Sequence, residues 1–237
     1  MPVVITPRAT IDDAFTEWMK DAYMTYLLHE KEKAVRHPGG KDRYLKERAP
    51  AHARALKVLQ VAHSDGRMGM EYEKTRLRSL PYARFTVVER NGERYGAGVT
   101  KPILITMPEG EMHAGTWHLG PYAVYVPFSA IEEQNAGRFH FIPLKNPKAN
   151  NRFPHHYCEK RYDDDVHPLD RSIYTCWGSF SAPIAVQLDA LDVPELFRTL
   201  QIYLSRYDPH SPLRYIDELD FDTRSPWVAD RVEGIRR

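Results

Sequence analysis

The sequence of 237 residues has few cysteines, no long apolar run and no excess of charge of either sign. Two cysteines are too few for a disulfide framework and suit a reducing compartment. The apolar runs are far shorter than the roughly 20 residues of a membrane-spanning helix. The opening MPVVITPRATIDD also lacks the basic and apolar regions of a secretory signal. With 33 Lys and Arg against 32 Asp and Glu, nothing global attracts nucleic acid or anionic lipid. We therefore expect a cytoplasmic protein with neither a nucleic-acid nor a membrane partner.

The composition is that of an ordinary globular protein, with 42% hydrophobic and 27% charged residues. A chain of this length can bury one substantial core, with or without an added helical segment. From the changes in pattern along the chain we expect an N-terminal helical segment (residues 1–66), an α+β domain (67–216) and a polar C-terminal tail (217–237).

Helical periodicity appears where apolar residues recur at three-and-four spacing, in residues 15–27, 50–62 and 193–207. Thr10 stands where the first of these helices needs an N-cap. Asp192 and the glutamate three residues later form a pair typical of a capping box at the start of the last one. We interpret these helices mainly as packing elements, because aromatic stripes at helical spacing usually belong to a core.

The middle of the chain changes to the period of two that is typical of strands. Residues 84–107 alternate around Asn91-Gly92, the strongest short signal for a hairpin, because both central residues of a type I′ turn need a positive φ. Further strands are predicted at 115–128 and 137–144, which completes an antiparallel meander. Residues 145–172 form an irregular stretch rich in Pro, Asn, His and Asp, and a loop of that length is usually functional or disordered.

Four stretches in this order carry a resemblance to a known family: GPYAVYVPF (120–128), GRFHFIPL (137–144), IYTCWG (173–178) and VPELFRTLQIYLSRYDPHSPL (193–213). The order is helix, meander, Pro/His-rich loop, short strand into a cysteine, and a helix that ends in Asp-Pro. It resembles the ubiquitin-conjugating enzymes and their RWD-like relatives over roughly residues 80–215. The Cys-Trp-Gly form is most similar to prokaryotic and phage members.

The resemblance implies a fold and a chemistry. The fold is α+β, a ubiquitin-conjugating-like core with an antiparallel β-meander and flanking helices, here with an N-terminal helical extension. Cys176 would be the thioester-forming residue of a cysteine-dependent acyl transferase, without a bound cofactor or metal. The implied partners are a ubiquitin-like modifier, the enzyme that activates it, and a target protein.

The family's His-Pro-Asn motif has no direct counterpart. FPHH (153–156) puts His155 in the Asn position, 21 residues before Cys176, whereas HPLD (167–170) starts nine residues before it and puts Leu169 there. We favour the first and treat the residues that follow it as an insertion. The candidate catalytic residues are therefore Cys176, His155, His167 and Asp170.

The residue types themselves suit acyl transfer. A free thiol with a pKa near 8.5 is a few per cent ionised at neutral pH, which is enough for attack on a thioester. An imidazole or a backbone N–H near Cys176 could stabilise the oxyanion, and His155 is our first choice. A positioned carboxylate such as Asp170 could orient the attacking amine.

Two other functions remain open. If Cys176 is buried, the chain could be a non-catalytic RWD-like interaction module, since free cysteine is among the most buried residue types. Alternatively, zinc could bind within the 22 positions that contain His155, His156, Cys158, His167 and Cys176. No paired ligand spacing supports zinc.

Overall fold

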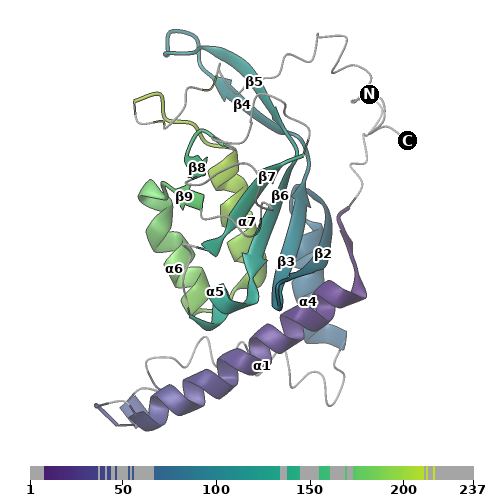
Figure 1. Cartoon of the computed structure of the whole chain (residues 1–237), viewed down its shortest axis with the longest axis vertical. Coiled ribbons are helices and arrows are strands. Elements are labelled where there is room, and N and C mark those ends of the chain that lie inside the picture. Colours follow the sequence, from purple (N-terminus) through teal and green to yellow (C-terminus); the bar gives the residue numbers. More distant parts are fainter. Residues whose placement is uncertain are drawn as a thin grey trace.

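A five-stranded sheet lies at the centre of the fold, with its strands in the order β1-β2-β3-β6-β7 (Figure 1). The strands are Thr10–Ile11 (β1), Tyr82–Arg90 (β2), Glu93–Thr100 (β3), Tyr122–Pro127 (β6) and His140–Pro143 (β7). β1 runs parallel to β2, whereas the other neighbouring pairs of this sheet are antiparallel. The chain therefore has the mixed α+β fold with a mostly antiparallel sheet that the sequence predicts.

The computed structural model describes residues 8–36, 38–40, 42–43, 46, 53, 55, 67–133, 138–144, 155–160, 169, 173–210, 212 and 216. Most of the predicted helix at 50–62 and the whole predicted tail from residue 217 lie outside these ranges. Within them, no helix is both long enough and apolar enough to cross a membrane.

The β2–β3 hairpin forms where the sequence predicts it. Asn91 and Gly92 have φ angles of 51° and 77°, as a type I′ turn requires. The two strands pair from Arg90 opposite Glu93 down to Tyr82 opposite Thr100.

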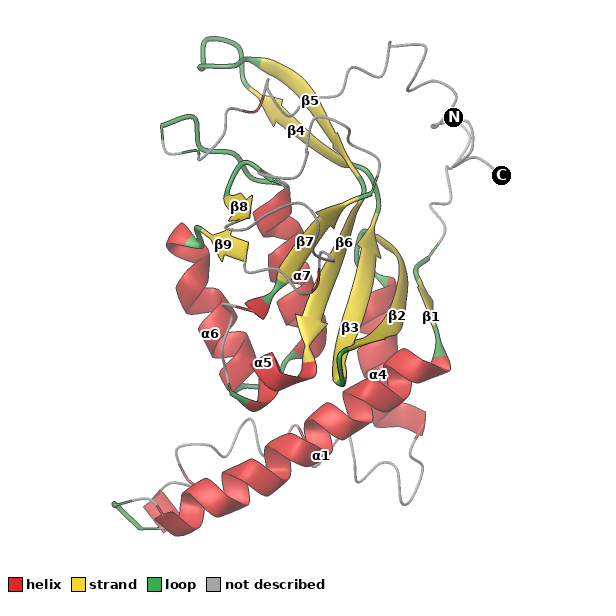
Figure 2. Cartoon of the chain, in the orientation of Figure 1, coloured by secondary structure: helices red, strands yellow, loops and turns green. Residues whose placement is uncertain are grey.

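A second hairpin interrupts the predicted meander. Ile103–Met107 (β4) and Gly115–Gly120 (β5), which lie between β3 and β6 in the sequence, pair with each other as a separate two-stranded sheet that extends beyond the end of the central sheet (Figure 2). The single strand predicted at 115–128 is divided into β5 and β6. The division falls at Gly120, whose φ of 75° turns the chain, and at Pro121, which has no amide hydrogen for a ladder.

Helices complete the fold around this sheet. They are Asp13–Arg36 (α1), Arg67–Arg78 (α4), Phe128–Glu132 (α5), the 3-10 turn Gly178–Phe180 (η3), Ser181–Asp189 (α6) and Val193–Leu204 (α7). The expectation that Thr10 caps α1 is wrong, because Thr10 pairs with Arg84 in the sheet. Asp12 is the cap instead, and its Oδ1 accepts a hydrogen bond from the N–H of Phe15 at 2.8 Å.

Helix α4 was not expected from the sequence. Met70 and Leu77 of its inner face are buried, but Glu73 lies between them and is buried as well. A carboxylate in the middle of the stripe hides the helical pattern. That carboxylate is satisfied by Arg76, at 3.2 Å.

Aromatic side chains join the helices to the sheet. The rings of Phe15 (α1), Phe85 (β2) and Phe197 (α7) contact one another with centroids 5.2–5.8 Å apart. Gly96 of β3 lets the Trp18 ring lie directly on the sheet, since a Cβ there would be 2.8 Å from it. The first half of α1 is therefore part of the same core as the sheet and α7.

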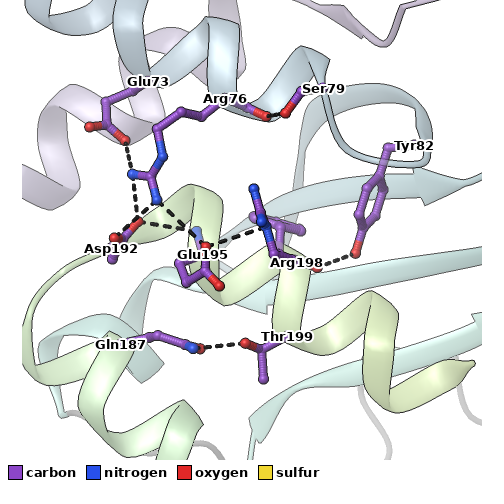
Figure 3. Close-up of polar contacts among 10 residues, drawn as sticks. Glu73, Arg76, Ser79, Tyr82, Gln187, Asp192, Glu195, Arg198 and Thr199 are labelled. Carbon is purple, nitrogen blue, oxygen red and sulfur yellow. Dashed lines mark hydrogen bonds and ion pairs between the residues drawn. The ribbon is translucent and has the colours of Figure 1, made fainter. Parts of the chain in front are cut away.

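Polar contacts fix the start of α7 against α4. The Arg76 guanidinium donates to both carboxylate oxygens of Asp192, at 2.8 and 3.1 Å (Figure 3). Asp192 also accepts from the N–H of Glu195 at 3.1 Å, which confirms the predicted helix cap. Gln187 of α6 donates to Thr199 of α7 at 2.7 Å, so that α6 is tied to the same helix.

Candidate functional site

Cys176 lies at the exit of a small two-stranded sheet formed by Cys158–Lys160 (β8) and Ile173–Thr175 (β9). Its N–H donates to the carbonyl of Tyr157 at 2.9 Å, which extends the pairing by one step beyond β9. Gly178, two residues later, has a φ of 49° and turns the chain into η3 and α6. The thiol of Cys176 is free, and the residue as a whole is partly exposed to solvent.

The residue after the cysteine is an aromatic anchor. Trp177 packs against the core, with its ring centroid 4.9 Å from that of Tyr203 and 5.9 Å from that of Phe141. A bulky anchor next to the thiol limits the motion of the segment that carries it.

Cys158 is placed very differently from Cys176. It is fully buried, and its Sγ lies 3.7 Å from the hydroxyl of Tyr203 and 4.0 Å from that of Thr175. Burial raises the pKa of the Cys158 thiol to about 12, so it stays protonated at neutral pH. Such a thiol is a weak nucleophile, whereas Cys176 is partly exposed to solvent.

His155 is also fully buried, and both of its ring nitrogens are used. Nε2–H donates to the carbonyl of Leu204 at 3.1 Å, because a carbonyl can only accept. This tautomer leaves Nδ1 to accept from the N–H of Tyr157 at 3.4 Å. Burial lowers the pKa of His155 to about 4, although the bond to the Leu204 carbonyl opposes that shift.

Neither nitrogen of His155 is therefore left to donate to an acyl group on Cys176. The side chain instead ties the start of β8 to the end of α7. The structure thus favours a positioning role for His155 over the role of oxyanion donor that the sequence suggests.

His156 reinforces the same connection. Its Nε2 lies 2.5 Å from the carbonyl of Arg206, and its ring centroid lies 3.9 Å from that of His155, with the two rings tilted by 34°. Burial, and then the neighbouring His155, hold the pKa of His156 well below its usual range. Two neutral histidines therefore occupy the carbonyl end of α7.

The other sequence-predicted site residues are not placed. His167 and Asp170 lie outside the described residues, so their roles stay predictions. Among the residues that the structure does describe, no three His, Cys, Asp or Glu side chains are gathered closely enough to hold a metal ion. The zinc alternative thus has no support from His155, His156, Cys158 and Cys176.

Tyr203 lies in the helix predicted at 193–207 but was not among the residues predicted for the site. Its hydroxyl contacts Cys158 and the backbone at Cys176. A usable signal existed, because a tyrosine at a core position of a helix needs a hydrogen-bond partner for its hydroxyl. The identity of that partner could not be read from the sequence.

Comparison with protein-family models, with curated proteins and with solved structures finds no match for this chain. The chemistry must therefore be inferred from the site itself. The site contains one partly exposed thiol at a strand end, a second thiol that is fully buried, and neutral aromatic and imidazole groups around them.

Proposed function

We propose that the protein carries a ubiquitin-like modifier as a thioester on Cys176 and passes it to an amine. The observation that carries this proposal is the contrast between the two thiols. Cys176 is partly exposed at the exit of β9, just before a turn into a helix, whereas Cys158 is fully buried. The order of helix, antiparallel strands, cysteine and helix adds support, because it is the order that the resemblance implies.

The first step exchanges one thioester for another. The Cys176 thiolate attacks the carbonyl carbon of the activated modifier, and the tetrahedral intermediate expels the thiolate of the activating partner. In the second step an amine attacks the new thioester, and the Cys176 thiolate leaves. The amine gives up a proton to solvent or to a positioned base, for which Asp170 remains the candidate.

The modifier need not be known for a first test. A peptide thioester that ends in glycine, with mercaptoethanesulfonate as the leaving group, can acylate the purified protein directly. Intact mass reports the adduct, tandem mass spectrometry locates it, and added lysine reports transfer to an amine. We expect acylation at Cys176, loss of the adduct in Cys176→Ser, and a rate close to that of the unaltered protein in Cys158→Ser.

A peptide with the sequence IYTCWGSF (173–180) is the matched control, because it carries the same thiol without the fold. Transfer to lysine should be at least about tenfold faster from the folded protein than from the acylated peptide, which corresponds to about 1.4 kcal/mol. Equal rates, with Cys176 still exposed, would favour the non-catalytic interaction module. An adduct on Cys158 alone would show that the wrong thiol has been chosen.

A further inference from the structure

The hydroxyl of Tyr203 lies between two backbone carbonyls at the end of the β8–β9 sheet. It is 3.3 Å from the carbonyl oxygen of Tyr157 and 3.3 Å from that of Cys176. The same Tyr157 oxygen also accepts from the N–H of Cys176, at 2.9 Å. One side chain from α7 thus holds both strands at the step that contains the proposed nucleophile.

The surroundings of Tyr203 keep this hydroxyl in place. The residue is 1% exposed, and its ring contacts the rings of Trp177, Phe141 and His155 with centroids 4.9–5.6 Å apart. Burial holds the pKa of Tyr203 far above its usual range, so the hydroxyl keeps its proton and can donate. The carbonyls at Tyr157 and Cys176 share that single proton.

We propose that Tyr203 is a positioning residue, whose hydroxyl clamps the backbone at Cys176 so that its thiol is held for acyl transfer. The inference rests on the proposed function for its catalytic consequence, but the clamp itself does not. α7 is fixed in the core through Leu200 and Leu204, both fully buried. The hydroxyl therefore fixes the backbone of Cys176, at the end of a short strand, relative to the rigid helix α7.

Tyr82 of β2 provides a matched control, because its hydroxyl bonds to the same helix. It is fully buried, and its hydroxyl donates to the carbonyl of Phe197 in α7 at 2.9 Å. Tyr82→Phe and Tyr203→Phe each remove one buried hydroxyl that donates to backbone, and both keep the ring. Only Tyr203→Phe removes a contact with Cys176.

The test combines amide hydrogen exchange at Cys176 with acylation by the glycine-ending peptide thioester. In Tyr203→Phe we expect the Cys176 amide to exchange about tenfold faster and the limiting rate of acylation to fall about tenfold, the effect of one lost hydrogen bond. The concentration of thioester at half-maximal rate should not change. In Tyr82→Phe the exchange rate of the Cys176 amide and the limiting rate of acylation should equal those of the unaltered protein, although the melting temperature falls.

Three results would overturn the inference. If the exchange rate of the Cys176 amide is unchanged in Tyr203→Phe, the Tyr203 hydroxyl does not clamp the backbone there, whatever happens to acylation. If exchange at Cys176 is faster in Tyr203→Phe but the acylation rate is unchanged, Tyr203 does not position the thiol for acyl transfer. Equal effects in Tyr82→Phe would assign the change to general loss of stability. If exchange is faster but even the unaltered protein is not acylated at Cys176, the clamp stands and the proposed function fails.

Discussion

The two ends of α7 are held by opposite kinds of chemistry. At its start, the charges of Arg76, Asp192 and Glu73 meet at 2.8–3.2 Å (Figure 3). At its end, the neutral rings of His155 and His156 donate to the carbonyls of Leu204 and Arg206. The first end depends on ionised groups, and the second end depends on groups that must stay uncharged.

This difference follows from what each helix end lacks. The first N–H groups of a helix have no intrahelical acceptor, and the Asp192 carboxylate supplies one while Arg76 balances its charge. The Leu204 carbonyl at the last helical residue accepts from the His155 imidazole, and the Arg206 carbonyl, two residues beyond the helix, accepts from His156. Full burial then keeps the imidazoles neutral. Acid should therefore weaken the Cys176 end of the molecule first.

The largest loss of stability is expected from a substitution in the middle of α7, which weakens the packing of the whole helix. Leu200 is fully buried in the middle of α7. Leu200→Ala should lower the free energy of unfolding by roughly 2 to 5 kcal/mol, through lost burial and the cavity left behind. Denaturant titration measures it. Ile202→Ala, on the exposed side of the same helix, should change the free energy of unfolding by no more than about 0.5 kcal/mol. If Leu200→Ala also lowers it by no more than that, α7 lies outside the core.

The next effect is a loss of stability in acid. The pKa of His155 is about 4 in the folded protein and 6.5 without the fold, so the unfolded chain binds more protons between these values. The contribution of neutral His155 is complete above pH 6.5 and is lost as the pH falls toward 4. The difference is worth about 3 kcal/mol. Unfolding titrations at pH 7.5, 6 and 5 should show the decline.

His155→Gln separates this effect from the titration of carboxylates. Glutamine keeps a donor near the position of Nε2 for the Leu204 carbonyl but takes up no proton. The variant should lose less stability than the unaltered protein between pH 6.5 and 5. Identical slopes for both proteins would contradict the assignment to His155.

The smallest effect is expected at the charged end. Asp192→Ala removes the helix cap and one partner of Arg76, and should cost about 1 to 2 kcal/mol. Asp192→Asn keeps a cap acceptor and loses only the charge, so its cost should be smaller. Thermal unfolding of both variants at neutral pH is the measurement. An Asn variant as unstable as the Ala variant would make the ion pair, not the cap, the dominant contribution.

Local signals in the sequence were enough to predict the sheet hairpin and the last helix. Asn91-Gly92 and the cap at Asp192 act over three or four residues, and both are confirmed. Thr10 was a wrong cap because its pairing partner is Arg84, far along the chain. Helix α4 was missed because a buried glutamate, Glu73, whose partner Arg76 is only partly buried, interrupts the hydrophobic pattern of its inner face.

The site was predictable only in part, for the same reason. A short strand leading into Cys176 was predicted from the sequence, and β9 ends one residue before it. The burial of His155 depends on Leu204, 49 residues away, and the partners of Tyr203 lie 27 and 46 residues away. No local pattern encodes such pairings.

The β2–β3 hairpin also bears on the order in which parts of the chain fold. A two-residue turn lets its strands find each other within microseconds, whereas contacts between distant residues must wait for larger loops to close. The bonds from α7 to β8 and to Cys176 are of the second kind. We therefore expect Cys158 to be sealed late, so that both thiols are most open to oxidation while the newly made chain is still folding.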